Sequence, residues 1–168
     1  MRTIRIGFSK PRGKVFPLFS WAIRLYERTA FSHVYVRWQT KYGFPLCYQA
    51  SSTMINFMGP SAFDKHLAVV EEFSFDVPDD KWEEFMKFCL ESVGKDYAIK
   101  GVFGVLIADF FRLKKNPFDR GENRQYCAEL VTRLLSHLGM DLNVDADRVK
   151  LKQVHEFVRK LAAQRGQK

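Results

Sequence analysis

The sequence has few cysteines, and they are not spaced for a metal site or a disulfide framework. Cys47, Cys89 and Cys127 are the three cysteines among 168 residues, and no CxxC motif or Cys/His cluster accompanies them. Structural zinc sites need such clusters, and small disulfide-stabilised folds usually carry an even number of cysteines. We therefore expect three free thiols, a reducing compartment, and no metal or other cofactor.

Long apolar runs are also missing. The longest, at residues 101–108, is much shorter than the roughly 20 residues that cross a bilayer. Residues 1–6 (MRTIRI) lack the apolar core of a signal peptide. We therefore expect a protein of the cytoplasm or of a phage particle, without a signal peptide or a membrane span.

The sequence shows no internal repeat, low-complexity stretch or linker, which favours one domain over residues 1–168. Apolar residues make up 46% of the chain, and 16 phenylalanines contribute to an aromatic share of 15%. This composition is typical of a packed globular protein and excludes a disordered one.

Positive charge is in excess, with a formal net charge of +8. Such an excess is compatible with nucleic acid, anionic lipid or an anionic cell-wall polymer as a partner. The Lys and Arg residues are spread along the chain, and no aromatic-basic motif of a nucleic-acid reader occurs. A nucleic-acid partner is therefore disfavoured, and the oligomeric state stays open.

Alternating patterns are concentrated before residue 78 and helical periodicity after it, which predicts an α+β fold with an antiparallel sheet packed against helices. The first expected helix places Leu18, Trp21, Ala22 and Leu25 on one face. The predicted strands are residues 3–8, 31–38, 46–50, 53–58 and 67–77, and the predicted helices are residues 18–28, 79–93, 97–111, 127–138 and 151–161.

Residues 125–131 (QYCAELV) place a cysteine at the start of a predicted helix. After Cys127, apolar residues recur at i, i+3 and i+4 as far as Leu138, so the helix should bury one face. A thiol in the first turn lies at the positive end of the helix dipole, which favours the thiolate. The alternative is a small buried hydrophobe, because Cys127 shares a helical face with Val131 and Leu134.

A base and an orienting group for such a thiolate lie far upstream, on two strands joined by a hairpin. His33 is near the start of one strand, and Gln49 is on the returning strand. Cysteine hydrolases use a thiolate nucleophile, an imidazole that takes and returns protons, and a polar side chain that holds the ring. Cys127, His33 and Gln49 are thus the candidate catalytic residues. The alternatives are a half-buried histidine and an ordinary polar strand residue.

These roles predict two contacts. The sulfur of Cys127 should lie about 3 to 4 Å from a ring nitrogen of His33. The carbonyl oxygen of Gln49 should hydrogen-bond the other ring nitrogen and fix its tautomer.

Four short motifs, taken in their order, resemble the circularly permuted NlpC/P60 group of papain-like cysteine hydrolases. The motifs are residues 32–36 (SHVYV), 48–50 (YQA), 94–97 (GKDY) and 126–130 (YCAEL). In that group the histidine strand precedes the cysteine helix. The resemblance covers roughly residues 30–135. It implies a permuted papain-like fold with Cys127 as the nucleophile, His33 as the base and Gln49 as the orienting residue.

Two positions depart from the pattern of that group. The third catalytic position is often acidic, whereas Gln49 is neutral, so it can orient the ring but stabilises an imidazolium less. The residue after the cysteine is often serine, and here it is Ala128. The first departure concerns the rate of the reaction and not the geometry of the site.

Neighbouring side chains extend the candidate site. Tyr35, on the same strand face as His33, and Tyr126 are candidate substrate-binding residues, with plain packing as the alternative. Packing is the favoured role for Tyr97. Glu129 is two positions after the thiol, about 200° around the helix, so it should face away and pair with a nearby Arg or Lys.

The resemblance implies a thiol hydrolase acting on an amide or peptide bond, for example in a cell-wall peptide. One alternative is a lipid acyltransferase or thioesterase of the permuted branch, and another is a binding or structural protein that keeps the fold without catalysis. The lipid alternative would bring the basic-flanked apolar stretch at residues 100–115 to a membrane surface. Its apolar positions go nearly all round the helix, which favours a buried core helix instead.

Overall fold

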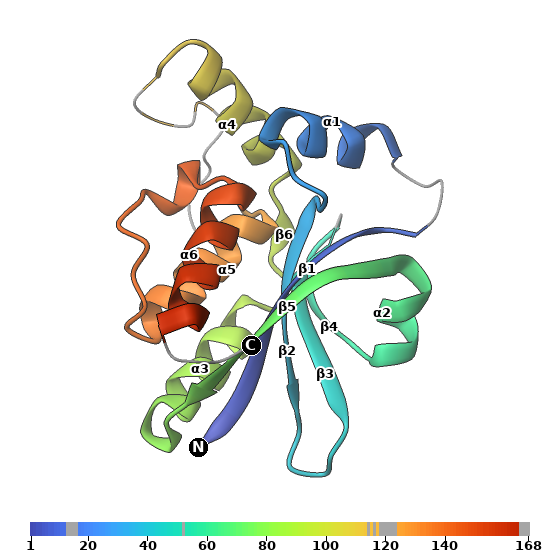
Figure 1. Ribbon diagram of the computed structural model, residues 1–168, viewed down its shortest axis with the longest axis vertical. Coiled ribbons are helices and arrows are strands. Elements are labelled where there is room, and N and C mark those ends of the chain that lie inside the picture. The colour runs from blue at the N-terminus through green and yellow to red at the C-terminus, as the bar shows by residue number, and fades with distance from the viewer. Residues whose placement is uncertain (13–16, 52, 114, 116, 118–123, 165–168) are drawn as a thin grey trace.

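The protein has an α+β fold built around a five-stranded antiparallel sheet with strand order β4-β3-β2-β1-β5 (Figure 1). The computed structural model describes residues 1–12, 17–51, 53–113, 115, 117 and 124–164. The strands of the sheet are β1 (Arg2–Pro11), β2 (His33–Gln39), β3 (Pro45–Ala50), β4 (Ile55–Met58) and β5 (Leu67–Val77). The helices are α1 (Pro17–Glu27), α2 (Pro60–His66), α3 (Asp79–Ser92), α4 (Ile99–Phe110), α5 (Cys127–His137) and α6 (Leu151–Gln164), with a short 3-10 turn, η2 (Ala146–Arg148).

Alternation along the strands separates two buried clusters of different size. Val34, Val36 and Trp38 of β2 face the main core. Tyr35 faces the other way and packs with Cys47 and neighbouring side chains in a small second cluster. Because successive strand side chains point to opposite faces, His33 belongs to the same face as Tyr35.

The helices cover the two faces of the sheet unequally. Helices α3, α5 and α6 lie on one side and α2 on the other, while α1 and α4 lie near each other at one end of the molecule (Figure 1). Helix α5 contacts β2, β3, α3 and α6, so it occupies the centre of the main core. Helix α5, which begins at Cys127, is therefore held in place by packing against the sheet and against two other helices.

The apolar face predicted for α5 is confirmed. Leu130, Val131, Leu134 and Leu135 are all buried in the main core. Burying a side chain of this size contributes roughly 1.5 to 3 kcal/mol. This packing holds the first turn of α5 in a fixed place against β2.

Two elements differ from the sequence prediction. Helix α2 lies between the strands predicted at residues 53–58 and 67–77, where no helix was predicted, and it begins at Pro60 because proline is well suited to the first position of a helix. Tyr97 was expected in the helix that is now α4. It belongs instead to β6 (Asp96–Tyr97), which pairs in parallel with β7 (Arg124–Gln125).

Helices α1 and α4, at the end of the molecule, are only partly packed against the core. The face of α1 that carries Trp21, Ala22 and Leu25 points to solvent. Helix α4 buries Val105 and Ala108, so one side of it joins the interior, as expected for this apolar stretch. Among the described residues, no helix combines the length and the apolar character needed to cross a membrane.

Candidate active site

Two local constraints place Cys127 at the first residue of α5. Tyr126 has an extended backbone, with φ −98° and ψ 167°, and ends the preceding extended segment as the N-cap. Just before it, Gln125 of β7 pairs with Tyr97 of β6. The thiol is therefore held between the short parallel ribbon and the buried face of α5.

Three hydrogen-bond donors surround the sulfur of Cys127. They are the backbone N–H of Val34 in β2, the backbone N–H of Ala128 in α5 and the hydroxyl of Tyr97 in β6. The backbone N–H of Cys127 donates in turn to the hydroxyl oxygen of Tyr97. These donors all favour negative charge on the sulfur.

Burial outweighs the donors and raises the pKa of the Cys127 thiol to about 11. The N–H groups of Val34 and Ala128 and the Tyr97 hydroxyl lower the pKa, whereas the carboxylate of Glu27 raises it. The helix start favours the thiolate as expected, but burial dominates, and a pKa of about 11 corresponds to a protonated thiol at neutral pH. The helix end supplies only about half an elementary charge. The stabilisation that this partial charge gives a thiolate is smaller than the free energy the thiolate loses when it gives up its hydration.

The predicted hydrogen bond between His33 and Gln49 is confirmed. Oε1 of Gln49 lies 2.8 Å from Nε2 of His33. The amide nitrogen of Gln49 points toward Sδ of Met58 at 3.5 Å, which is consistent with the oxygen facing the ring. Because the amide oxygen can only accept, Nε2 carries the proton and Nδ1 is the basic nitrogen of the neutral ring.

The end of the sheet opens where this pair lies. The ladder between β2 and β3 runs from the hairpin to Val36 and Tyr48 and does not reach His33. On its other side His33 pairs with Ser9, where the register between β1 and β5 shifts by one residue. Irregularities of this kind re-aim side chains next to active sites. The link between β2 and β3 at His33 is therefore made by side chains.

Burial lowers the pKa of His33 to about 4, and the hydrogen bond to Gln49 acts in the opposite direction. The ring is neutral at neutral pH because an imidazolium would lose its hydration in this half-buried position. The resting site thus combines a neutral imidazole with a neutral thiol.

Cys127 reaches this end of the sheet from the main core, whereas the side chain of His33 leaves β2 on the face of Tyr35. The sulfur accepts a hydrogen bond from the N–H of Val34, the residue that directly follows His33. The distance of about 3 to 4 Å between the sulfur and a ring nitrogen stays a prediction.

A small cavity of about 30 Å³ lies beside Cys127. Its lining includes the polar residues Glu27 and Tyr97 and the apolar residues Ile23 and Val105. A space of this volume holds about one or two water molecules. Since α1 and α4 supply part of the lining, access to the thiol depends on these two helices.

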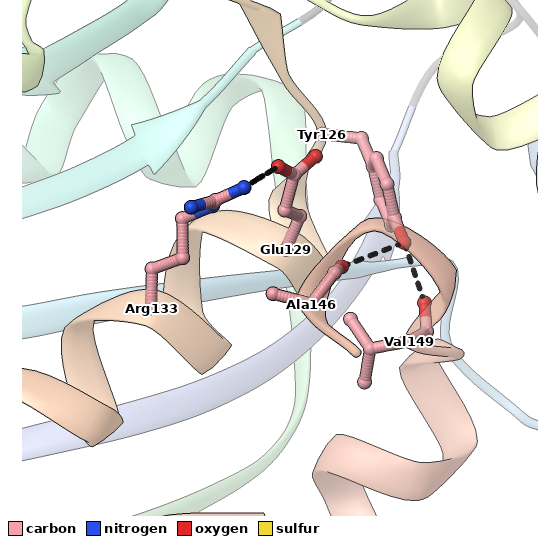
Figure 2. Close-up of polar contacts among 5 residues, drawn as sticks. All are labelled: Tyr126, Glu129, Arg133, Ala146 and Val149. Carbon is pink, nitrogen blue, oxygen red and sulfur yellow. Dashed lines mark hydrogen bonds and ion pairs between the residues drawn. The ribbon is translucent and has the colours of Figure 1, made fainter. Parts of the chain in front are cut away.

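Glu129 and Tyr126 support the start of α5 (Figure 2). The carboxylate of Glu129, 2% exposed as a residue, accepts a hydrogen bond from Nη2 of Arg133 at 3.0 Å, so the predicted pairing with a basic residue is confirmed. The hydroxyl of Tyr126 donates to the carbonyl oxygens of Val149 at 2.9 Å and Ala146 at 3.2 Å. These contacts tie the N-cap of α5 to the segment before α6.

No family model matches the sequence, and no curated protein matches it. The permuted NlpC/P60 fold therefore stays a prediction, whereas the α+β class and the antiparallel sheet are observed. Within the described ranges, no group of three or more His, Cys, Asp or Glu residues is placed to hold a metal ion. The candidate site rests on the geometry around Cys127, His33 and Gln49.

Tyr97 is the candidate functional residue that sequence reasoning undervalued. It was assigned to packing, yet its hydroxyl contacts both the sulfur and the backbone N–H of Cys127. The available signal was its place in the GKDY motif. A two-residue parallel strand pair has no periodicity that a sequence pattern can reveal.

The two predicted substrate-binding tyrosines are placed differently. Tyr126 is buried but lines the cavity beside Cys127, so its substrate contact stays a prediction. Tyr35 is fully buried, and its hydroxyl donates to Glu72 at 2.6 Å. This placement gives Tyr35 a packing role and offers no support for a substrate contact.

Proposed function

We propose that the protein is a cysteine hydrolase that cleaves an amide or peptide bond through a thioacyl intermediate on Cys127. The observation that carries the proposal is the 2.8 Å hydrogen bond between His33 and Gln49. It leaves Nδ1 of His33 free to act as a base, one residue from the backbone N–H that contacts the thiol. A cysteine, a histidine and an orienting amide are the parts that this chemistry needs.

In the proposed reaction, Nδ1 of His33 takes the thiol proton while the sulfur attacks the carbonyl carbon of the substrate. The backbone N–H of Cys127 and the hydroxyl of Tyr97 give up their resting contacts, with the Tyr97 oxygen and the sulfur respectively, and donate to the developing oxyanion. The imidazolium then protonates the leaving amine as the C–N bond breaks. Water, deprotonated by His33, attacks the thioester and releases the acid and the free thiol.

The two pKa values favour a thiolate that forms only during the reaction. The thiol has a pKa of about 11 and the imidazole a pKa of about 4. Both shifts oppose charge separation, so for independent groups the ion pair would be less stable than the neutral pair. Attraction between thiolate and imidazolium at close range reduces that cost. We therefore expect a low reactivity toward general electrophiles before substrate binds.

A test with defined variants follows from these roles. Purified cell-wall peptides are incubated with the protein, and the release of free amines gives kcat/KM. Cys127→Ala and His33→Ala should each lower it by at least about 10³-fold. Cys89→Ala, which removes another buried free thiol, is the matched control and should retain activity. Full activity of Cys127→Ala would refute the hydrolase proposal.

A second readout does not depend on the choice of peptide. A nitrophenyl ester of an N-acyl amino acid, which can bind as a peptide substrate does, is mixed with the protein, and the intact mass is measured after a short reaction. The wild type should gain one acyl group on Cys127, and Cys127→Ala should gain none there. Acylation of Cys89 or Cys47 instead would contradict the assigned nucleophile.

Acyl transfer from a lipid is a second candidate function, favoured by the apolar side of the cavity. Ile23, Val102 and Val105 line the space beside the thiol, which at about 30 Å³ has to widen before it admits a hydrocarbon chain. The two candidates differ in the group that becomes attached to Cys127. A fatty acyl adduct formed from phospholipid, with no turnover of peptides, would select the lipid reaction.

A further inference from the structure

Helix α1 carries large apolar side chains on its outer face. Trp21, Leu25 and Tyr26 are 54%, 62% and 43% exposed, whereas Ser20 and Ile23 are buried. A surface helix normally shows the reverse pattern, with its apolar stripe toward the core and polar residues outside. The outer face of α1 is therefore suited to an apolar environment that the folded chain does not supply.

The residues after α4 extend this apolar surface. Phe111 and Leu113 are 65% and 40% exposed. The hydroxyl of Tyr26 donates to the carboxylate of Asp109, which joins α1 to the end of α4. Figure 1 shows the two helices near each other at one end of the molecule. Their exposed apolar side chains therefore belong to the same end.

Positive charge borders these side chains. Arg28, Arg112 and Lys115 are exposed next to the apolar positions. The acidic residues of the two helices both have partners: Glu27 accepts backbone N–H groups at the start of α6, and Asp109 binds Tyr26 and Lys150. Arg28, Arg112 and Lys115 are the cations at this border, while the exposed Asp141 and Asp145 line a hollow with Asp109 on the other side of it.

We propose that this end of the molecule docks on an anionic lipid surface. The docking face consists of Trp21, Leu25, Tyr26, Phe111 and Leu113, with Arg28, Arg112 and Lys115 at its border. Apolar side chains of an interfacial helix enter the boundary between headgroups and acyl chains, while cations bind anionic headgroups. Two copies of a chain with a net charge of +8 repel each other, so charge favours a lipid over a second copy.

Docking on this face would bring the thiol cavity close to the bilayer. Tyr26 belongs both to the docking face and to the lining of the cavity that contains Cys127. The proposal does not depend on catalysis, because Cys127→Ala leaves every side chain of the docking face in place. The inactive variant should therefore bind vesicles as the wild type does.

The test is flotation with large vesicles of phosphatidylcholine containing phosphatidylserine, compared with phosphatidylcholine alone. The wild type should float with the anionic vesicles and bind the neutral ones more weakly, and added salt should reduce binding. The double variant Trp21→Ser, Leu25→Ser should lower the partition coefficient at least about tenfold. Leu90→Ser on α3 is the matched control because Leu90 is 61% exposed, almost the same as Leu25.

Three outcomes would overturn the proposal. The first is no flotation with anionic vesicles, and the second is equal binding of the wild type and the double variant. The third is a dimer in sedimentation equilibrium that the double variant abolishes, which would make this face a contact between copies. Thermal unfolding of each variant checks that the substitutions leave the protein folded.

Discussion

At Cys127, burial and hydrogen bonding act in opposite directions on one sulfur atom. Two backbone N–H groups and the Tyr97 hydroxyl favour the thiolate, but burial dominates and the pKa is about 11. A cysteine at a helix start suggests an activated thiol only when water or a cation also reaches it. At Cys127 the hydrogen-bond donors are in place, but the sulfur carries no negative charge for them to stabilise until the thiol loses its proton.

The alkylation of Cys127 by iodoacetamide should therefore accelerate with pH and level off only near pH 11, because the thiolate is the reacting form. Tyr97→Phe removes a donor and should raise the midpoint, whereas Glu27→Gln removes a negative charge and should lower it. Peptide mapping by mass spectrometry at each pH gives the rate, with Cys127→Ala as the blank. A wild-type midpoint near the ordinary cysteine value of about 8.5 would contradict the burial argument.

The neutral amide at residue 49 predicts a distinct pH dependence. His33 must be neutral to act as a base, so kcat/KM should fall as pH drops through about 4. Gln49→Glu adds a negative charge beside the ring, raises the pKa of His33 and should move this fall to higher pH. Gln49→Ala should cost about 10 to 100-fold in activity because the ring loses its orienting partner. An unshifted profile for Gln49→Glu would show that residue 49 does not control His33.

The pair of His33 and Gln49 could be predicted because strand alternation and one hairpin are enough to bring the two residues together. The protonation state of Cys127 could not be predicted from the sequence. It depends on how far the sulfur is buried and on donors from β2 and β6, which lie far from it in the sequence. A local pattern reports the helix start and not the surroundings of the side chain there.

Strands β1, β2 and β5 are joined by one side chain that lies across them. The ring of Tyr35 in β2 lies over Gly7 in β1, and its hydroxyl reaches Glu72 in β5 at 2.6 Å. Glu72 also pairs with Arg37 at 2.7 Å. A glycine at residue 7 is thus required by the close approach of the ring.

Gly7→Ala should destabilise the protein by roughly 1 to 3 kcal/mol, the usual cost of overpacking. A Cβ at residue 7 would lie 2.2 Å from Cζ of Tyr35, so the ring would have to move away from Glu72. Urea unfolding gives the change in the free energy of unfolding. Gly59→Ala is the control because a Cβ there meets no atom within 4 Å. Equal stability of the two variants would show that the Tyr35 ring shifts without cost.

The regular elements were predicted well and the short ones were not. The strands at residues 31–38 and 67–77 and the helix that begins at Cys127 have long periodic patterns, and they appear as β2, β5 and α5. Tyr97 was assigned to the following helix because its pairing with Gln125 involves only two residues on each side. For α1, periodicity identified a face but could not say whether that face points inward or outward.

The stability of the whole molecule should depend on pH through His33. Its pKa is about 4 in the folded protein and about 6.5 in an unfolded chain, so the unfolded state binds the proton first as pH falls. The contribution of neutral His33 to the free energy of unfolding is fully present above about pH 6.5. It is lost as pH drops toward 4, which lowers the free energy of unfolding by about 3 kcal/mol. Urea unfolding at both ends of this range measures it.

His33→Gln provides the comparison for that measurement because glutamine does not titrate. The variant should lose less stability than the wild type between neutral pH and about pH 4, and the difference isolates the imidazole from the carboxylates. Identical pH dependence of the two proteins would mean that residue 33 is as accessible to protons in the folded state as in the unfolded one.

The short ribbon of β6 and β7 also sets where this sequence can change over evolutionary time. Tyr97 and Gln125 pair across it, so the two ends of the intervening segment, residues 98–123, are held next to each other. Lengthening such an excursion costs only about 0.6 kcal/mol for each doubling of its length. Helix α4 packs Val105 and Ala108 into the interior, so changes of length are tolerated after it, where they leave the pairing of Tyr97 with Gln125 in place. Under the proposed function, substrate preference can therefore change in this segment while Cys127 and Tyr97 keep their places.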